Sequence, residues 1–224
     1  MRVKLNRRAN FARLPVVYIF PRGEISLTLR FTVFAFIIYL FCIIVAEANY
    51  CGVHKEKMDD LMLIQFQKAG IEIPCLIMTY APVERFNEFD PQNITDYCYF
   101  KNPNQQLLYP VMVDMDGKNE ILSVLINEET IFEKNLFGID EPSNGMEVSP
   151  DDIDMVIVPL LGFDTKGYRV GYGKGFYDRF LGRCKKDCIK VGFSYFEPVE
   201  AIEDINQFDI KLDYCVTHEK FYSF

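Results

Sequence analysis

A glycine-rich stretch at residues 162–181 holds the side chains best suited to chemistry in this chain. Its glycines leave no β-carbon between the backbone amides and a bound anion, so successive N–H groups can converge on phosphate oxygens. Arg169 and Lys174 add positive charge beside them. We therefore expect a phosphate-binding loop, whose central glycines are Gly171, Gly173 and Gly175.

The residues after this loop have the spacing of a helix face. Apolar side chains recur at i, i+1, i+4 and i+5, and Gly182 ends the pattern. The start of such a helix favours an anion further. The glycine spacing is G-x-G-x-G with no following Lys-Ser/Thr, so the loop is neither a Rossmann fingerprint nor a Walker A loop. The residues of the helix face are Phe176, Tyr177, Phe180 and Leu181.

Two carboxylates are candidates for a metal site. Asp178 lies in the first turn of the expected helix, and Asp213 opens the last expected strand. Magnesium is typically held by one or two carboxylates together with substrate phosphates. The alternative for Asp178 is a surface acid favoured by the helix dipole. With a phosphate site beside them, Asp178 and Asp213 are expected to hold Mg²⁺.

The elements around the loop indicate its place in the fold. Residues 155–161 are apolar on both faces, which is typical of a central parallel strand. Helices are expected over residues 54–70 and from Pro91, and residues 127–150 are expected to be rich in loops. The alternation predicts a three-layer α/β/α open sheet, mostly parallel, with ligands at the carboxyl ends of its strands. Further strands are expected at residues 107–113, 121–126, 190–195 and 212–216.

Composition excludes several classes of protein. With 224 residues, 50% of them apolar and 25% charged, the chain is neither disordered nor collagen-like nor a coiled coil. A net charge of −8 argues against a nucleic-acid-binding protein, which needs a basic surface. The seven cysteines are an odd number without a repeated spacing, so neither a disulfide framework nor a zinc site is expected. The cysteine pattern favours a reduced, cytoplasmic protein.

The N-terminal segment has a different character. Residues 1–30 contain seven Lys/Arg and one acid, and residues 31–46 form an uncharged run of sixteen. As a helix this run is ~24 Å long, against ~30 Å of bilayer hydrocarbon. Three interpretations stay open: a membrane anchor at residues 25–48, a signal peptide with a small-x-small site at residues 46–48, or a wrongly assigned start. We therefore divide the chain into an atypical segment, 1–53, and an α/β domain, 54–224.

Residues 158–181 resemble the signature of the 5-formyltetrahydrofolate cyclo-ligase family, also called methenyltetrahydrofolate synthetases. The similarity continues in residues 80–90, 138–142 and 212–217, and it covers about residues 54–224. It implies the same three-layer fold. It also implies a small-molecule activity in which ATP and Mg²⁺ convert 5-formyltetrahydrofolate to 5,10-methenyltetrahydrofolate, with release of ADP and phosphate.

The resemblance assigns roles to individual residues. It implies that Arg169 and Lys174 act in catalysis by neutralising phosphate charge, and that Asp178 and Asp213 bind Mg²⁺. Glu88 would hydrogen-bond the pterin ring, with Val83 packing nearby. We expect a monomer without a nucleic-acid partner. The residues expected to hold ATP are Arg169, Gly171, Gly173, Lys174, Gly175 and Tyr177.

One departure from the family keeps alternatives open. Members begin with a basic helix whose Lys and Arg side chains reach the ATP phosphates, whereas the match here starts at about His54. Lys55 and Lys57 are the first basic residues within the match. The alternatives are an inactive folate- or nucleotide-binding homologue held at a membrane by residues 25–48, or another phosphate-binding enzyme of sugar or coenzyme A metabolism.

Overall fold

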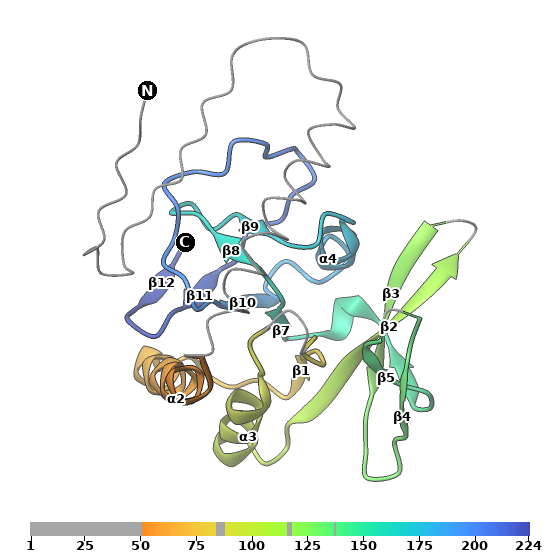
Figure 1. The fold of residues 1–224 in the computed structure, drawn as a ribbon. Coiled ribbons are helices and arrows are strands. Elements are labelled where there is room, and N and C mark those ends of the chain that lie inside the picture. Colours follow the sequence, from red (N-terminus) through yellow and green to blue (C-terminus); the bar gives the residue numbers. More distant parts are fainter. Residues whose placement is uncertain (1–50, 84–87, 116–117, 137) are drawn as a thin grey trace, which may run out of the picture.

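A computed structural model describes residues 51–83, 88–115, 118–136 and 138–224, which are built around one eight-stranded sheet (Figure 1). Its strands are β1 (Leu76–Met78), β2 (Gln106–Met115), β3 (Lys118–Leu125), β6 (Met146–Val148), β7 (Met155–Val158), β10 (Ile189–Phe193), β11 (Tyr214–Val216) and β12 (Phe221–Ser223). They lie in the order β12-β11-β10-β7-β1-β2-β3-β6.

The centre of the sheet is parallel and its edges are antiparallel. Each neighbouring pair from β11 through β10, β7 and β1 to β2 is parallel. The outer strands β12, β3 and β6 pair antiparallel with their neighbours. The predicted, mostly parallel α/β sheet is thus confirmed.

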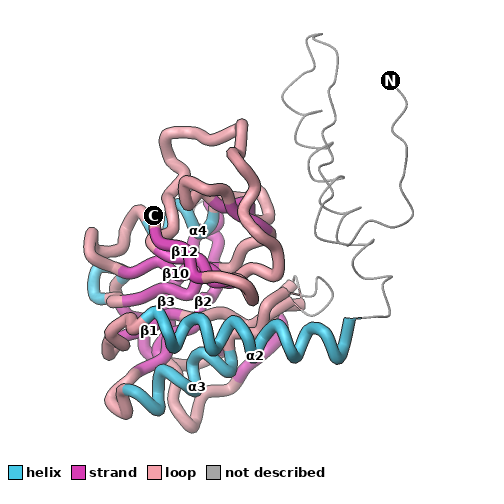
Figure 2. The backbone as a smooth tube through the Cα atoms, turned by 90° about the vertical axis from the view of Figure 1, so that its left-hand side faces the viewer, coloured by secondary structure: helices cyan, strands magenta, loops and turns pink. Residues whose placement is uncertain are grey.

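Helices cover both faces of the sheet. α2 (Cys51–Ala69) and α3 (Gln92–Lys101) lie on one side of the strands, and α4 (Phe176–Leu181) lies on the other (Figure 2). These are the three helices expected from the sequence. In α2, Met62 and Phe66 are buried, whereas Leu61 is 43% exposed. No helix within the described ranges is long and apolar enough to cross a membrane.

Strand β7 shows why the sheet needs two layers of helix. All four of its side chains are buried. Successive residues of a strand point to opposite faces of the sheet, so both faces must be covered. Val156 and Val158 pack into the cluster that contains Phe180 of α4. Met155 and Ile157 pack into the cluster that contains Phe66 of α2. Full burial of one such side chain contributes about 1.5–3 kcal/mol, which fixes β7 at the centre of the fold.

The connections place a topological switch point beside β7. The chain runs from β1 through α3 to β2 on one side, and from β7 through α4 to β10 on the other. The two crossovers therefore leave the adjacent strands β1 and β7 in opposite directions. In open α/β sheets, ligands bind outside the carboxyl ends of the strands at such a switch point. The residues that follow β1 and β7 are the ones expected at a ligand.

Residues 127–150 correct a prediction, because they are not simply loop. They contain the hairpin β4 (Phe132–Lys134) and β5 (Asp140–Pro142), followed by β6 (Figure 1). All three β4 side chains are exposed, so no apolar periodicity marks the strand. Glu141 is buried, and its Oε1 accepts hydrogen bonds from the Met112 amide at 3.1 Å and from Asn135 Nδ2 at 2.7 Å.

The glycine stretch also contains short strands. β8 (Gly162–Phe163) and β9 (Arg169–Val170) form a separate two-stranded sheet between β7 and α4. A 3₁₀ turn at Pro150–Asp152 leads into β7. The anchor, signal-peptide and misassigned-start interpretations all concern residues 1–50, which lie outside the described residues and stay untested.

Candidate active site

The glycine loop between β9 and α4 combines two kinds of glycine. Gly173 and Gly175 have φ values of +76° and +63°, a left-handed conformation that favours glycine. Gly171 has no such φ, and a β-carbon built on it would meet no described atom within 4 Å. Neither conformation nor packing in the described structure thus requires glycine at 171. An open backbone at this position fits the close approach of a phosphate.

A buried ion pair fixes both ends of this loop. Arg169 Nη2 lies 3.0 Å from Oδ1 of Asp178, and 5% of the arginine side chain is exposed. Arg169 Nη1 donates to the main-chain oxygen of Ile210 at 2.6 Å. The Ile210 amide donates to the same Asp178 oxygen at 3.1 Å. The structure thus brings Arg169 and Asp178 together and ties them to the segment before β11.

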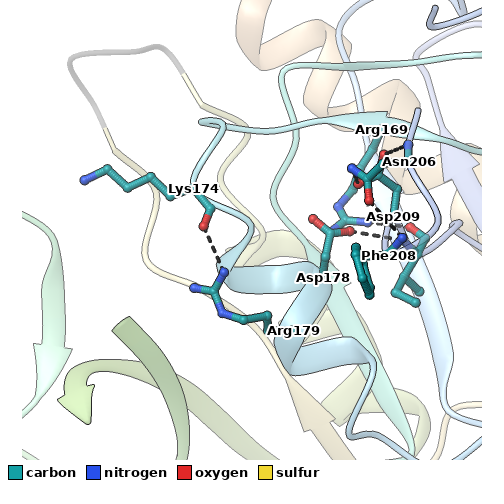
Figure 3. A network of polar contacts seen from close by, with 8 residues as sticks. Arg169, Lys174, Asp178, Arg179, Asn206, Phe208 and Asp209 are labelled. Carbon is teal, nitrogen blue, oxygen red and sulfur yellow. Dashed lines mark hydrogen bonds and ion pairs between the residues drawn. The ribbon is translucent and has the colours of Figure 1, made fainter. Parts of the chain in front are cut away.

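The segment at Ile210 is itself held by a tight turn (Figure 3). The side chain of Asp209 accepts hydrogen bonds from the Asn206 amide at 2.8 Å and from Asn206 Nδ2 at 2.7 Å. Asn206 Oδ1 in turn accepts from the Phe208 amide at 2.8 Å. These contacts hold the backbone that presents Ile210 to Arg169 and Asp178.

Lys174 lies on the outer side of the loop. Its side chain is exposed and points away from Arg169 and Asp178 (Figure 3). Its main-chain oxygen accepts a hydrogen bond from Arg179 Nη1 at 3.1 Å, which holds the backbone of the loop. The ammonium group is therefore placed where an anion arriving from solvent would meet it.

Glu88 is a buried acid that lies beside the glycine loop. The residue lies in the segment that follows β1, and it is 8% exposed. The Val83 amide donates to Oε2 at 2.8 Å, and the Tyr172 hydroxyl donates to Oε1 at 3.2 Å. The structure thus brings Val83 and Glu88 together, and it joins both to the glycine loop. Burial raises the pKa of the Glu88 carboxyl, whereas Val83, Tyr172 and Lys55 act to lower it.

Two tyrosines near Glu88 stay protonated. Burial raises the pKa of Tyr80 and of Tyr177, and the negative charge of Glu88 raises both further. The Tyr80 hydroxyl donates to the main-chain oxygen of Phe89 at 3.0 Å. These side chains give the site neutral aromatic walls that carry hydroxyl groups.

A second group of contacts comes from α2 and was not predicted. Lys55 Nζ donates to the main-chain oxygen of Glu88 at 3.2 Å, and it lies 5.9 Å from the ring centroid of Tyr195. The Tyr195 hydroxyl donates to Oδ1 of Asp59 at 2.6 Å. Helical spacing places Lys55 and Asp59 on one face, which the sequence does reveal. Their partners lie too far along the chain for any local pattern to show them.

Asp213 makes its contacts apart from Asp178. It precedes β11, and its Oδ2 lies 2.8 Å from Lys190 Nζ and accepts from the Lys190 amide at 2.8 Å. Two residues separate Asp213 from Ile210, which Asp178 holds. Across the described ranges, no group of three or more His, Cys, Asp or Glu is placed to hold a metal. One or two carboxylates suffice for Mg²⁺ bound with phosphates, so the oxygen donors present fit that ion.

Comparison with known families identifies relatives of this chain. The sequence model of the 5-formyltetrahydrofolate cyclo-ligase family matches residues 77–217. A 5-formyltetrahydrofolate cyclo-ligase of Mycoplasma genitalium is 38% identical over 82 residues, which are 36% of this chain and 48% of the relative. The Haemophilus influenzae protein of the same name is 36% identical over 115 residues, 48% of this chain and 61% of the relative. This chain thus spans about half to three fifths of these relatives.

Solved structures show the same fold. The NMR structure of Aquifex aeolicus 5,10-methenyltetrahydrofolate synthetase has a TM-score of 0.64 at 24% identity, covering 86% of this chain and 92% of that one. A 5,10-methenyltetrahydrofolate synthetase from Mycoplasma pneumoniae has a TM-score of 0.57 at 20% identity, covering 84% and 98%. At these identities the likeness concerns the fold alone.

Proposed function

The chain belongs to the 5-formyltetrahydrofolate cyclo-ligase family, and we propose that it converts 5-formyltetrahydrofolate to 5,10-methenyltetrahydrofolate, using ATP and releasing ADP and phosphate. The whole reaction is a proposal for this chain, because the sequence matches cover only part of the relatives named above.

The observation that carries the proposal is the meeting of two segments at the switch point. The segment after β1 contributes the buried carboxylate of Glu88, and the loop after β7 contributes the glycines and Lys174. The Tyr172 hydroxyl joins the buried carboxylate to the glycine loop. This supports a carboxylate that accepts from ring N–H donors next to a loop that binds phosphates. A reaction between a folate and a nucleotide needs these two kinds of site next to each other.

The proposed chemistry needs little covalent work from the protein. The formyl oxygen attacks the γ-phosphorus of ATP, and ADP leaves. The N10 amine then attacks the activated formyl carbon and gives up its proton, the bond from carbon to oxygen breaks, and phosphate carries away the oxygen and the proton. Phosphoryl transfers of this type depend mainly on positioning and on neutralising charge.

The residues of this chain supply those two effects. Amides around Gly171, Gly173 and Gly175 would donate to phosphate oxygens, with Tyr177 as a neutral wall. Lys174 would place its ammonium on the phosphates from the solvent side. Arg169 adds a fixed positive charge, held by its ion pair with Asp178. Glu88 would accept hydrogen bonds from the pterin ring, with Val83 beside it.

Asp178 and Asp213 are the proposed ligands of Mg²⁺. The ion neutralises phosphate charge when it is bound with ATP. Each carboxylate now contacts a basic side chain, Arg169 for Asp178 and Lys190 for Asp213. Metal binding therefore competes with these ion pairs, and oxygen atoms of both carboxylates would turn toward the nucleotide.

The direct test is an assay of the full chain in which the absorbance of the methenyl product is recorded. We expect product only when 5-formyltetrahydrofolate, ATP and Mg²⁺ are all present, with one ADP released per product. Binding of both substrates without product would instead support the inactive homologue. Turnover of ATP with sugar or coenzyme A substrates, and none with the folate, would contradict the proposal.

We place this activity in the cytoplasm, where ATP and reduced folates are available, and expect a monomer. Carbonate extraction of membranes tests the location. Complete release of the full chain supports a cytoplasmic enzyme, whereas firm retention supports an anchor at residues 25–48. Light scattering of the purified chain tests the monomer.

A further inference from the structure

One hydrogen bond joins the two halves of the proposed site. The Tyr172 hydroxyl donates to Oε1 of Glu88 at 3.2 Å, across 84 residues of sequence. Tyr172 belongs to the loop after β7, and Glu88 belongs to the segment after β1. The two sides of the switch point are therefore linked by a side chain of the glycine loop and the buried acid.

Because Tyr172 lies within the glycine loop, the position of its hydroxyl depends on the conformation of the loop backbone. It lies between Gly171, whose backbone is open, and Gly173, whose φ is +76°. The residue is 46% exposed, so a large part of its side chain lies outside the core. A rearrangement of the loop amides around an anion moves the backbone that carries Tyr172, and its hydroxyl moves with it.

Glu88 is arranged to respond at one oxygen. The Val83 amide holds Oε2 at 2.8 Å, which is a short contact for a backbone donor. The contact of Oε1 with Tyr172 is longer than the roughly 2.5–2.7 Å of a strong hydroxyl–carboxylate bond. Hydrogen bonds of this kind are often long before substrates bind and tighten in the complex. The Tyr172 bond is thus the adjustable one of the two.

We propose that Tyr172 is a positioning residue that couples nucleotide binding at the glycine loop to folate binding at Glu88. This inference rests on the proposed function and extends it from two neighbouring sites to two cooperating ones. Closure of the loop on phosphate shortens the bond to Oε1 and orients the carboxylate for the pterin. Linkage requires the effect to be mutual, so the folate tightens nucleotide binding by the same factor.

Calorimetry on the full chain and its Tyr172→Phe variant measures this coupling. The dissociation constant of 5-formyltetrahydrofolate is determined without and with a saturating non-hydrolysable ATP analogue and Mg²⁺, and the converse titration follows. For the original chain we expect each ligand to tighten the other by at least about fivefold, within the usual range of coupling. In Tyr172→Phe we expect the dissociation constants with and without the second ligand to agree within about twofold. The affinity for the nucleotide alone should be unchanged.

Steady-state kinetics distinguishes positioning from a general loss of structure. In Tyr172→Phe the KM for the folate should rise at saturating ATP, while kcat stays within about twofold. Tyr99→Phe makes the same change at a residue of α3 that is 59% exposed, and it should behave like the original chain. Equal coupling in Tyr172→Phe and the original chain would overturn the inference and leave the proposed function intact. Failure of the original chain to bind either ligand would overturn the function itself, and the inference with it.

Discussion

The guanidinium of Arg169 lies 3.0 Å from Oδ1 of Asp178, nine residues further along, and encloses the glycine loop between two paired ends. The pair is anchored to Ile210 by one donated and one accepted hydrogen bond. The backbone between its members can thus meet a ligand while its two ends keep their positions. Besides their proposed roles toward ATP and Mg²⁺, Arg169 and Asp178 thus hold the ends of the loop.

Asp178→Asn should reduce the free energy of unfolding by about 3 kcal/mol, because it leaves the charge of Arg169 buried and unpaired. Chemical denaturation with urea measures the loss. The matched control is Asp140→Asn, which breaks an ion pair with Lys134 whose side chains are 48% and 68% exposed. That change should cost roughly 0–1 kcal/mol. Equal losses in the two variants would contradict the structural role of the buried pair.

Lys174→Ala should raise the KM for ATP or lower kcat, with a combined loss of roughly 10- to 100-fold, the usual range for one hydrogen bond to a charged group. Its stability should change little, since the side chain is exposed. Steady-state kinetics and a urea titration test both statements. Lys166→Ala removes another exposed lysine of the same glycine stretch and serves as control. An unchanged rate in Lys174→Ala would remove this residue from the phosphate site.

Gly171→Ala should separate binding from folding. Its β-carbon meets no described atom within 4 Å and its φ is not left-handed, so stability should stay within about 0.5 kcal/mol. The methyl group would occupy the approach of the phosphate and weaken nucleotide binding. Gly175→Ala should instead destabilise by about 1 kcal/mol, because residue 175 has a φ of +63°. Thermal unfolding and nucleotide titration test the pair of variants, and unaltered nucleotide affinity in Gly171→Ala would count against an open phosphate cradle.

Folate affinity should fall as the pH is lowered, starting at a higher pH than for an exposed glutamate. The ionised Glu88 carboxylate is the acceptor, and burial raises its pKa, so the acceptor is lost as the pH falls through that raised value. Lys55 of α2 faces this group, as do three tyrosines that stay neutral or donate to it: Tyr80, Tyr172 and Tyr177. Calorimetric titration of 5-formyltetrahydrofolate across the acidic range measures the effect.

Two variants identify the titrating group. Glu88→Gln should bind the folate weakly and without this pH dependence. Asp59 also has a pKa raised by burial, so Asp59→Asn is the necessary control, and its pH profile should match the original chain. Protonation of Glu88 should not unfold the protein. Its pKa is raised in the folded state, so binding a proton there favours the folded state. A shift of the pH profile in Asp59→Asn would show that Asp59, rather than Glu88, causes the pH dependence of folate affinity.

Lys55→Ala should raise the KM for the folate by about fivefold, the effect of roughly 1 kcal/mol from one lost hydrogen bond. The reason is its contact with the main-chain oxygen of Glu88. Lys57→Ala, at an exposed position of the same helix, should leave this KM unchanged. An increase in the KM for ATP alone would show that Lys55 reaches the nucleotide instead, in the manner of the family's N-terminal basic helix.

The sequence predicted the centre of the fold better than its edges. Residues 155–161 have a continuous apolar pattern, and the structure confirms the strand as β7, although it ends at Val158 before Pro159. β4 and β5 were missed because their pairing, rather than any burial pattern, defines them. In β8 and β9, each strand has two residues, which are too few for periodicity to appear.

Sequence motifs predict the residues of the candidate site. They do not predict the hydrogen bonds that join its separate segments. Glycine spacing marks the loop around Gly171, but it does not reveal that Tyr172 reaches Glu88. From the sequence, Lys55 is only one of the first basic residues within the family match, whereas the structure places it on the Glu88 backbone. Such contacts depend on how β1, β7 and α2 are arranged in space. The metal ligands Asp178 and Asp213 stay a prediction.

The hydrogen bond from Tyr195 to Asp59 spans 136 residues, and it has a consequence for synthesis at the ribosome. Domains are made from the amino terminus onward, so Asp59 emerges long before its partner Tyr195. A chain that has grown only through α4 already contains the glycine loop but lacks Tyr195, β10 and β11. The contacts of Asp59 and Lys55 with Tyr195 therefore form only after most of the chain has been made. A ligand that binds only the folded state would stabilise the finished protein.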